Sequence, residues 1–103
     1  MKKGTFKIRV YSGAGHTFND KKGLIGKYFA VGNKSPEDCG FSVTHLETGF
    51  RITSFDKQKQ AKKFIELADK IEDIENLSVE NAENYKNDLY CLSFIIKESH
   101  GKI

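Results

Sequence analysis

Hydrophobic and polar residues alternate over 5–11, a pattern that predicts a half-buried strand. The next segment, 12–23, is rich in Gly, Asn and Asp and has no periodicity, so we expect a long loop there. That loop lacks the glycine and lysine spacing of a phosphate-binding loop. A second short strand is predicted over 27–31.

The clearest pair of strands is predicted over 41–46 and 50–54. The residues between them end in Gly49, which can adopt the left-handed backbone that a three-residue hairpin loop requires. In such a hairpin His45 lies opposite Arg51, with the neighbouring pairs Leu46–Phe50 and Thr44–Ile52.

Two helices are predicted in the rest of the chain. The first would begin at Lys57 after Asp56 as its cap, with an apolar stripe of Ala61, Phe64, Ile65, Ala68, Ile71 and Ile74. The second would be capped by Ser78, with a stripe of Ala82, Tyr85, Leu89, Leu92 and Ile96. Residues 89–96 also contain the aromatic and β-branched residues typical of strands. Because the stripe begins well before 89, the helix is favoured.

These elements predict an α+β fold in the order β-β-β-β-α-α. A four-stranded antiparallel sheet would carry two C-terminal helices on one face and leave its other face to solvent. The length of 103 residues suits a single domain spanning 1–103. We expect the core to contain Phe6, Ile8, Val10, Leu46, Phe50, Ile52, Phe64, Ile65, Ala68, Ile71, Leu89 and Leu92.

The charged residues are distributed unevenly, although the net charge is only +3. Residues 1–63 contain 13 basic and 5 acidic side chains, whereas 64–103 contain 4 basic and 9 acidic ones. This separation bears on binding partners rather than on the fold.

The sequence predicts a cytoplasmic protein that needs no metal and no cofactor. It contains no apolar run long enough to span a membrane, and no apolar segment follows the basic N-terminus as in a signal peptide. Cys39 and Cys91 are far apart and share no ligand-like spacing with a histidine, so two reduced thiols are expected.

The solvent face of the sheet is the first candidate binding site. Its expected residues are Lys7, Arg9, Tyr11, His45 and Arg51, with Phe41 and Val43 adding apolar area. Basic side chains interleaved with aromatic ones suit a phosphate backbone and stacked bases. The alternative is that these are the ordinary outward residues of a half-buried sheet.

A second basic element lies at the start of the first helix, where Lys57, Lys59, Lys62 and Lys63 gather. Positive charge is mildly unfavourable at the positive end of the helix dipole, which suggests an anionic partner. An ordinary solvated helix face would explain the same run of lysines.

Acidic residues follow along the same helix and beyond it. The candidates for an acidic interface are Glu66, Asp69, Glu72, Asp73 and Glu75. Carboxylates on a rigid surface can imitate nucleic acid and occupy a basic cleft of another protein. Polar outer faces of amphipathic helices are the alternative.

The leading hypothesis is a small non-enzymatic binding protein that contacts nucleic acid through the basic sheet face. The alternative is an inhibitor or adaptor of a host protein, of the kind by which mobile elements block defence enzymes. A small metal-free nuclease using His16, His45 and Arg51 is a third hypothesis. Exposed strand edges would also permit a homodimer.

Overall fold

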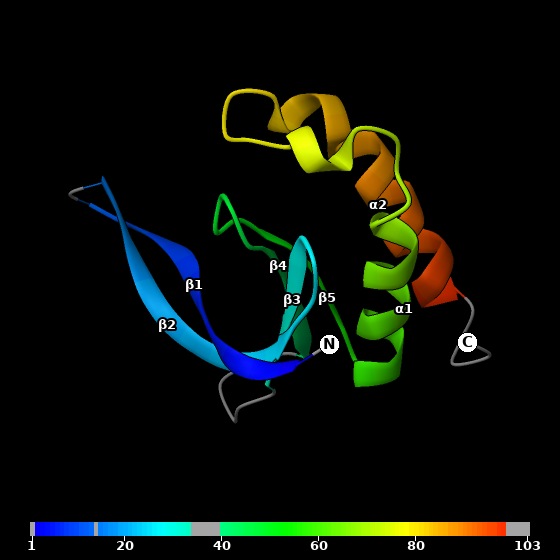
Figure 1. Cartoon of the computed structure of the whole chain (residues 1–103), viewed down its shortest axis with the longest axis horizontal. Helices are drawn as coiled ribbons and strands as arrows, with labels where there is room; N and C mark the ends of the chain where they lie inside the picture. Colours follow the sequence, from blue (N-terminus) through cyan, green and yellow to red (C-terminus); the bar gives the residue numbers. More distant parts are fainter. Residues whose placement is uncertain (1, 14, 34–39, 99–103) are drawn as a thin grey trace.

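The computed structural model describes residues 2–13, 15–33 and 40–98. Within them, one antiparallel sheet has the order β1-β2-β3-β4-β5, so each strand lies beside its neighbours in sequence. The helices lie together on one side of the sheet (Figure 1). The strands are β1 (Lys2–Ser12), β2 (Gly15–Ile25), β3 (Phe29–Gly32), β4 (Phe41–His45) and β5 (Arg51–Phe55). The helices are α1 (Gln58–Ala68), the 3-10 helix η1 (Ile74–Asn76) and α2 (Ala82–Glu98).

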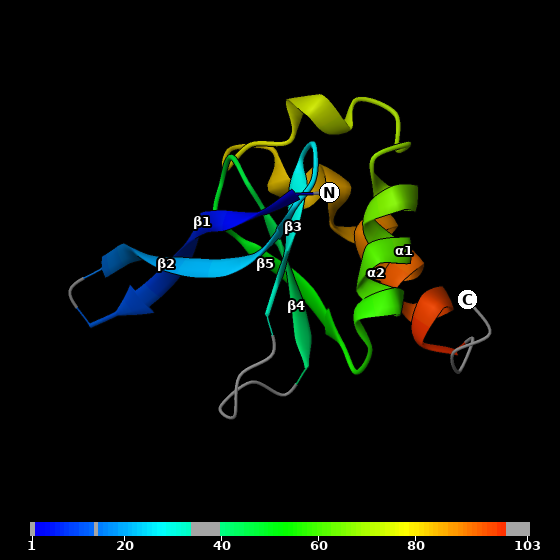
Figure 2. The same cartoon turned by 60° about the horizontal axis from the view of Figure 1, so that its bottom comes forward.

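The α+β class, with an antiparallel sheet and two C-terminal helices, is confirmed, but the strand count is wrong. The described residues form five strands rather than four, because β2 occupies most of the segment expected to be a loop. It pairs with β1 from Lys2 opposite Ile25 to Ser12 opposite Gly15. The two strands form a hairpin, the β1–β2 arm, that extends away from the helices (Figures 1 and 2).

The predicted hairpin over 41–54 is present, and its register holds up to Val43 opposite Thr53 but is shifted by one residue from Thr44 to the loop. Gly49 has a φ of 75°, the left-handed conformation expected of it. Arg51 lies opposite Thr44 rather than His45, and Thr53 lies opposite Val43. The residue between them on β5 is Ile52, so the ladder contains a bulge that the sequence pattern does not reveal.

Both helices are confirmed, and residues 89–96 belong to α2 rather than to a strand. The residue preceding α1 is Lys57, not Asp56, and it makes no side-chain capping hydrogen bond. Because α1 ends at Ala68, the apolar stripe continues beyond the helix and ends in η1. The expected cap of α2 is also wrong: the backbone N–H of Ser78 donates to Asn81 Oδ1 at 2.7 Å, and the helix begins at Ala82.

The core lies between the two helices and the face of β3–β5 that they cover. Phe64 of α1 packs between Phe29 and Phe55, with ring centroids 6.3 and 5.6 Å away. Val43, expected on the solvent face, is 0% exposed because its face of the sheet carries the helices. Phe41, expected beside it, is half-buried against the same core.

Other core expectations are met in part. Buried as expected are Phe6, Phe64, Ile65, Ala68 and Leu89. Only half-buried are Ile8, Val10, Leu46, Phe50, Ile52, Ile71 and Leu92. Buried residues outside the expected core set include Phe29, Val31, Phe55 and Leu77, together with Ile74 and Ile96 from the predicted apolar stripes.

The sheet curls until its first strand meets the turn between β4 and β5. The backbone N–H of Arg9 in β1 donates to Gly49 O at 2.9 Å. Gly4, Gly23 and Gly32 lie opposite one another across three strands. A Cβ on Gly23 would lie only 2.0 Å from the oxygen of Val31, so the close approach of strands at this bend needs glycine.

Candidate functional site

The residues expected on one basic sheet face lie on two different faces. Cross-strand pairing carries the face of Lys7 and Arg9 across β2 and β3 to Val43, which packs against the helices. Arg51 lies opposite Thr44, the neighbour of Val43, and therefore belongs to the other face. The structure does not bring these basic residues together as one surface.

The side chain of Arg9 contacts the protein rather than solvent alone. Its guanidinium carbon lies 4.9 Å from the ring centroid of Phe18 and 5.0 Å from that of Phe50. Its Nε donates a hydrogen bond to Thr48 O at 3.0 Å. These contacts attach the β1–β2 arm to the β4–β5 turn, which gives Arg9 a structural role.

Lys7 and Tyr11 are the other predicted members on β1. Lys7 forms an ion pair of 2.6 Å with Asp20, directly across the arm. The backbone of Tyr11 lies in β1, while its side chain lies outside the described part of the structure.

His45 is buried, with 2% of its surface exposed. The backbone N–H of Thr48 donates to its Nδ1 at 3.4 Å, and the Thr48 hydroxyl lies 2.9 Å from the same atom. That hydroxyl oxygen accepts a hydrogen bond from the N–H of Phe50. We therefore assign the Thr48 hydroxyl as the donor and His45 Nδ1 as the acceptor of the bond between them. Burial lowers the pKa of His45, while the charge of Glu47 opposes this shift. The imidazole is thus a neutral member of the turn.

The three residues of the nuclease hypothesis are not seen as a group. His45 faces the core, whereas Arg51 lies on the opposite face and is exposed. The side chain of His16 lies outside the described residues. Within the described residues, no three His, Cys, Asp or Glu side chains are placed to hold a metal ion.

The lysines at the start of α1 are exposed, with one exception. Lys57, Lys59 and Lys62 are exposed, while Lys63 is half-buried and lies 3.7 Å from Glu66. The first turn of α1 contains no acidic side chain. No acidic side chain in the first turn therefore offsets the positive charge of these lysines.

Next to this helix start lies a groove of about 490 Å³ at the base of the β1–β2 arm, here called the basic groove. Among the described residues its charged lining consists of Lys3 and Lys22, two exposed lysines on the same face of neighbouring strands. It is lined by Lys3, Gly4, Thr5, Lys22, Gly23, Leu24, Asn33 and Gln58.

Sequence reasoning missed Lys3 and Lys22 as site residues because it assigned Lys22 to a loop. The missing signal is the pairing of β1 with β2, which places Thr5 opposite Lys22 and Leu24 opposite Lys3. The two lysines are therefore diagonal neighbours on the arm.

The predicted acidic residues follow α1 into η1. Glu66, Glu72, Asp73 and Glu75 are exposed, and they extend beyond the end of the helix rather than along one helix face. Asp69 is half-buried, and its Oδ1 has no hydrogen-bond partner among the described residues. Burial raises the pKa of Asp69, and the charge of Lys27 opposes the shift.

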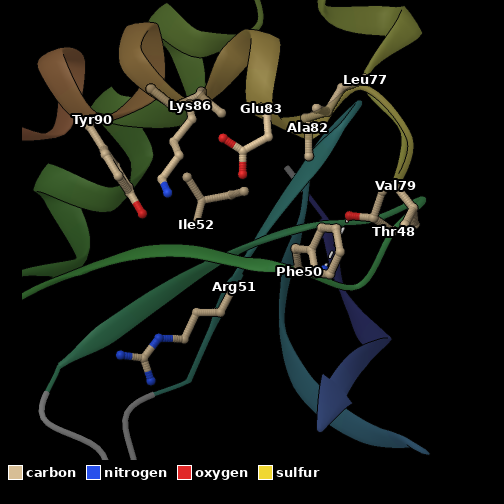
Figure 3. A pocket seen from close by; sticks show the side chains of 11 residues that line it. Thr48, Phe50, Arg51, Ile52, Leu77, Val79, Ala82, Glu83, Lys86 and Tyr90 are labelled. Atoms are coloured by element: carbon tan, nitrogen blue, oxygen red, sulfur yellow. Dashed lines mark hydrogen bonds between the residues drawn. The ribbon is translucent and has the colours of Figure 1, made fainter. Parts of the chain in front are cut away.

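A second groove, the β5–α2 groove, has a volume of about 310 Å³ and a mixed lining (Figure 3). Ile52 points from β5 toward α2, where Glu83, Lys86 and Tyr90 point back toward the strand. Its lining residues are Thr48, Phe50, Arg51, Ile52, Leu77, Val79, Ala82, Glu83, Lys86, Leu89 and Tyr90.

Comparison of the chain with protein-family models, with curated proteins and with solved structures gave no match. None of the described helices is both long and apolar enough to cross a membrane. Cys91 is an exposed free thiol on α2, and Cys39 lies outside the described residues.

Proposed function

We propose that this protein is a non-enzymatic binding protein that holds the phosphate backbone of a nucleic acid in the basic groove. The observation that carries the proposal is a groove of about 490 Å³ that, among the described residues, two lysines line and no carboxylate does. Charges of one sign around a concave surface focus the field and attract a polyanion.

The lysines of the groove are available to a ligand. Neither Lys3 nor Lys22 has a carboxylate partner within the described part of the chain. The N-terminus of α1 reaches the groove through Gln58, and the exposed lysines Lys57, Lys59 and Lys62 belong to the same helix start. The positive end of the helix dipole adds to their field.

The kind of binding follows from the type of basic residue. Lysine ammonium groups contact phosphates as point charges, whereas base recognition usually relies on bidentate side chains such as arginine. Of the two arginines, Arg9 is held by the fold and Arg51 lies on another surface. We therefore expect binding with little sequence preference and a strong dependence on salt.

The predicted binding residues contribute unequally to this proposal. Lys57, Lys59 and Lys62 are retained as the helix side of the basic surface, and Lys3 and Lys22 are added. Lys63 is next to Lys62 in the sequence, but it forms an ion pair with Glu66.

The test is fluorescence anisotropy with end-labelled single-stranded and duplex oligonucleotides over a salt series. For duplex DNA, log K should fall with log salt by about 0.9 per phosphate contact. The double variant Lys3→Glu with Lys22→Glu should lose most of the affinity and flatten this slope. Both side chains are exposed, so circular dichroism should show an unchanged fold.

The matched control is Lys86→Glu with Lys70→Glu, which reverses two exposed lysines outside the lining of the basic groove. It makes the same change in net charge and should lower affinity only slightly, through the general field. Equal losses in both variants would show that net charge alone, and not the groove, binds the oligonucleotide. No binding of the wild-type protein at low salt would reject the proposal.

The alternative of an inhibitor or adaptor, which offers its carboxylates to a basic cleft of a host protein, remains a prediction. The exposed carboxylates of Glu72 and Glu75 are the residues to reverse. Glu72→Lys with Glu75→Lys should leave or strengthen oligonucleotide binding under the proposed function. The alternative is favoured if Glu72→Lys with Glu75→Lys abolishes binding to a host protein while Lys3→Glu with Lys22→Glu leaves that binding unchanged.

A further inference from the structure

We propose a second binding site, at the free edge of β5. An extended segment of a partner protein would add to this strand as a further strand of the sheet. It would place an apolar side chain in the β5–α2 groove and an acidic side chain beside Arg51. This site is separate from the basic groove and does not depend on it.

Strand β5 lies at an edge of the sheet. It is the last strand in the order and pairs on one side only, with β4, within the described residues. The backbone groups of an edge strand can pair with an extended peptide, and neighbouring side-chain pockets then give specificity.

The β5–α2 groove runs beside this strand. Ile52 and Phe50 form its apolar wall on the sheet side, and Leu77 and Leu89 belong to the opposite wall. The Thr53 and Ser93 hydroxyls are 2.8 Å apart, a hydrogen bond that joins β5 to α2. This hydrogen bond fixes the position of β5 relative to α2 beside the groove.

Exposed apolar surface continues outward from the groove along α2. Val79 and Tyr90, which line the groove, are 49% and 52% exposed, and Phe94 one turn beyond Tyr90 is 64% exposed. Apolar side chains of this size on the surface of a small charged protein are typical of a protein interface.

The strand also carries a positive charge, on Arg51. Arg51 extends away from α2 (Figure 3) and has no carboxylate partner within the described part of the chain. Successive side chains of an added strand would point alternately to the groove side and to the Arg51 side. An acidic residue next to an apolar one would satisfy both sides, and a bidentate pair with arginine is the strongest such contact.

A second copy of this chain suits the site less well, because β5 has the sequence RITSF and contains no carboxylate. In a pair of β5 strands from two copies, Arg51 would therefore find no acidic partner among the residues of the other β5; Asp56, which follows that strand, is the nearest carboxylate in the sequence.

The experiment starts with a random linear peptide library displayed on phage and panned on the full-length protein. Selected peptides should alternate apolar and acidic residues. Arg51→Glu should weaken the best peptide by about tenfold or more, the usual effect of removing a charged pair. A peptide with its acidic residue changed to Lys should recover affinity for Arg51→Glu, which a merely misfolded variant would not allow.

Two further measurements test the extended geometry and the independence of the site. N-methylation of the peptide backbone should abolish binding, and the β5 amides should gain protection from hydrogen exchange on binding. Lys3→Glu with Lys22→Glu should bind the peptide as wild type does, even if it loses oligonucleotides.

Four results would overturn the proposal. In the first, the library yields no enriched peptides, and in the second, the selected peptides bind Arg51→Glu as well as wild type. In the third, a peptide with an N-methylated backbone still binds, as expected for a peptide that docks as a helix. In the fourth, the β5 amides are protected from hydrogen exchange without peptide, in a dimer of this chain.

Discussion

The guanidinium carbon of Arg9 lies 5.0 Å from the ring centroid of Phe50, a contact that joins the first strand of the sheet to the turn before the last. The ring centroid of Phe18 lies 4.9 Å from the same atom, and Thr48 O accepts from Arg9 Nε. Phe50 also lines the β5–α2 groove. A side chain of the β1–β2 arm thus contacts one of the residues that line this groove.

Arg9→Ala should lower the free energy of unfolding by about 1–3 kcal/mol, because two cation–π contacts and a hydrogen bond are lost. Arg9→Lys should recover only part of this loss, since lysine keeps the charge but not the planar group. Urea denaturation measures both. Lys7→Ala is the control, because its exposed ion pair with Asp20 should contribute less than about 1 kcal/mol. An equal effect at both positions would contradict the structural role of Arg9.

Gly49→Ala should destabilise the same junction. Gly49 has a φ of 75°, and a Cβ there would lie 3.0 Å from Phe18 Cε1 and 3.2 Å from Arg9 N. The left-handed backbone alone costs alanine about 1–2 kcal/mol, and the crowding adds to it. Gly13→Ala is the matched control, since no heavy atom lies within 4 Å of its Cβ. We expect thermal melting to show a clear decrease for Gly49→Ala and almost none for Gly13→Ala.

Phe64→Ala should cost about 3–5 kcal/mol, the usual range for removing a buried aromatic ring. Phe64 is 0% exposed and packs against Phe29 and Phe55, so the surrounding rings cannot easily fill the space. The control is Phe94→Ala on α2, where 64% of the residue is exposed and the change should stay within about 0.5 kcal/mol. A loss below about 1 kcal/mol for Phe64→Ala would contradict the packing described here.

The sequence predicts those elements whose apolar residues face one common core. Both helices and the β4–β5 hairpin show this periodicity, and all three are present. Strand β2 was missed because it is a polar segment that lies largely outside this core. Its residues 17–20 are all exposed, and Phe18 reaches Arg9 instead of the core. Pairing with β1, not burial, holds β2 in place, and periodicity does not report such pairing.

The site could be predicted less well than the fold, for a related reason. Assigning side chains to faces requires the register, and the bulge at Ile52 moves Arg51 by one position relative to β4. A slip of one residue transfers a side chain to the opposite face of a sheet. For this reason Arg51 was wrongly expected on the same face as Arg9. The proximity of Lys3 and Lys22 depends on the pairing of β2 with β1, which the sequence pattern does not reveal.

The stability of the protein should decrease as the pH falls below about 6.5, in part because of His45. In the folded protein burial lowers the pKa of His45 below its ordinary value of 6.5. The unfolded chain therefore takes up a proton at a higher pH than the folded protein does, which favours unfolding. Protonated Nδ1 could no longer accept the N–H of Thr48, so the turn that holds Arg9 would lose a hydrogen bond.

His45→Asn tests this prediction, because an asparagine carbonyl can accept the same N–H but does not titrate. We expect the variant to be less stable at about pH 7.5, owing to the smaller side chain, but to lose less stability on acidification than wild type. One histidine can contribute at most about 1.4 kcal/mol per pH unit, and urea denaturation at several pH values resolves a difference of that size. The other histidines are the same in both proteins and cancel. If the free energy of unfolding depends on pH with the same slope in both proteins, His45 has the same pKa in the folded and unfolded chain. That result would contradict the prediction.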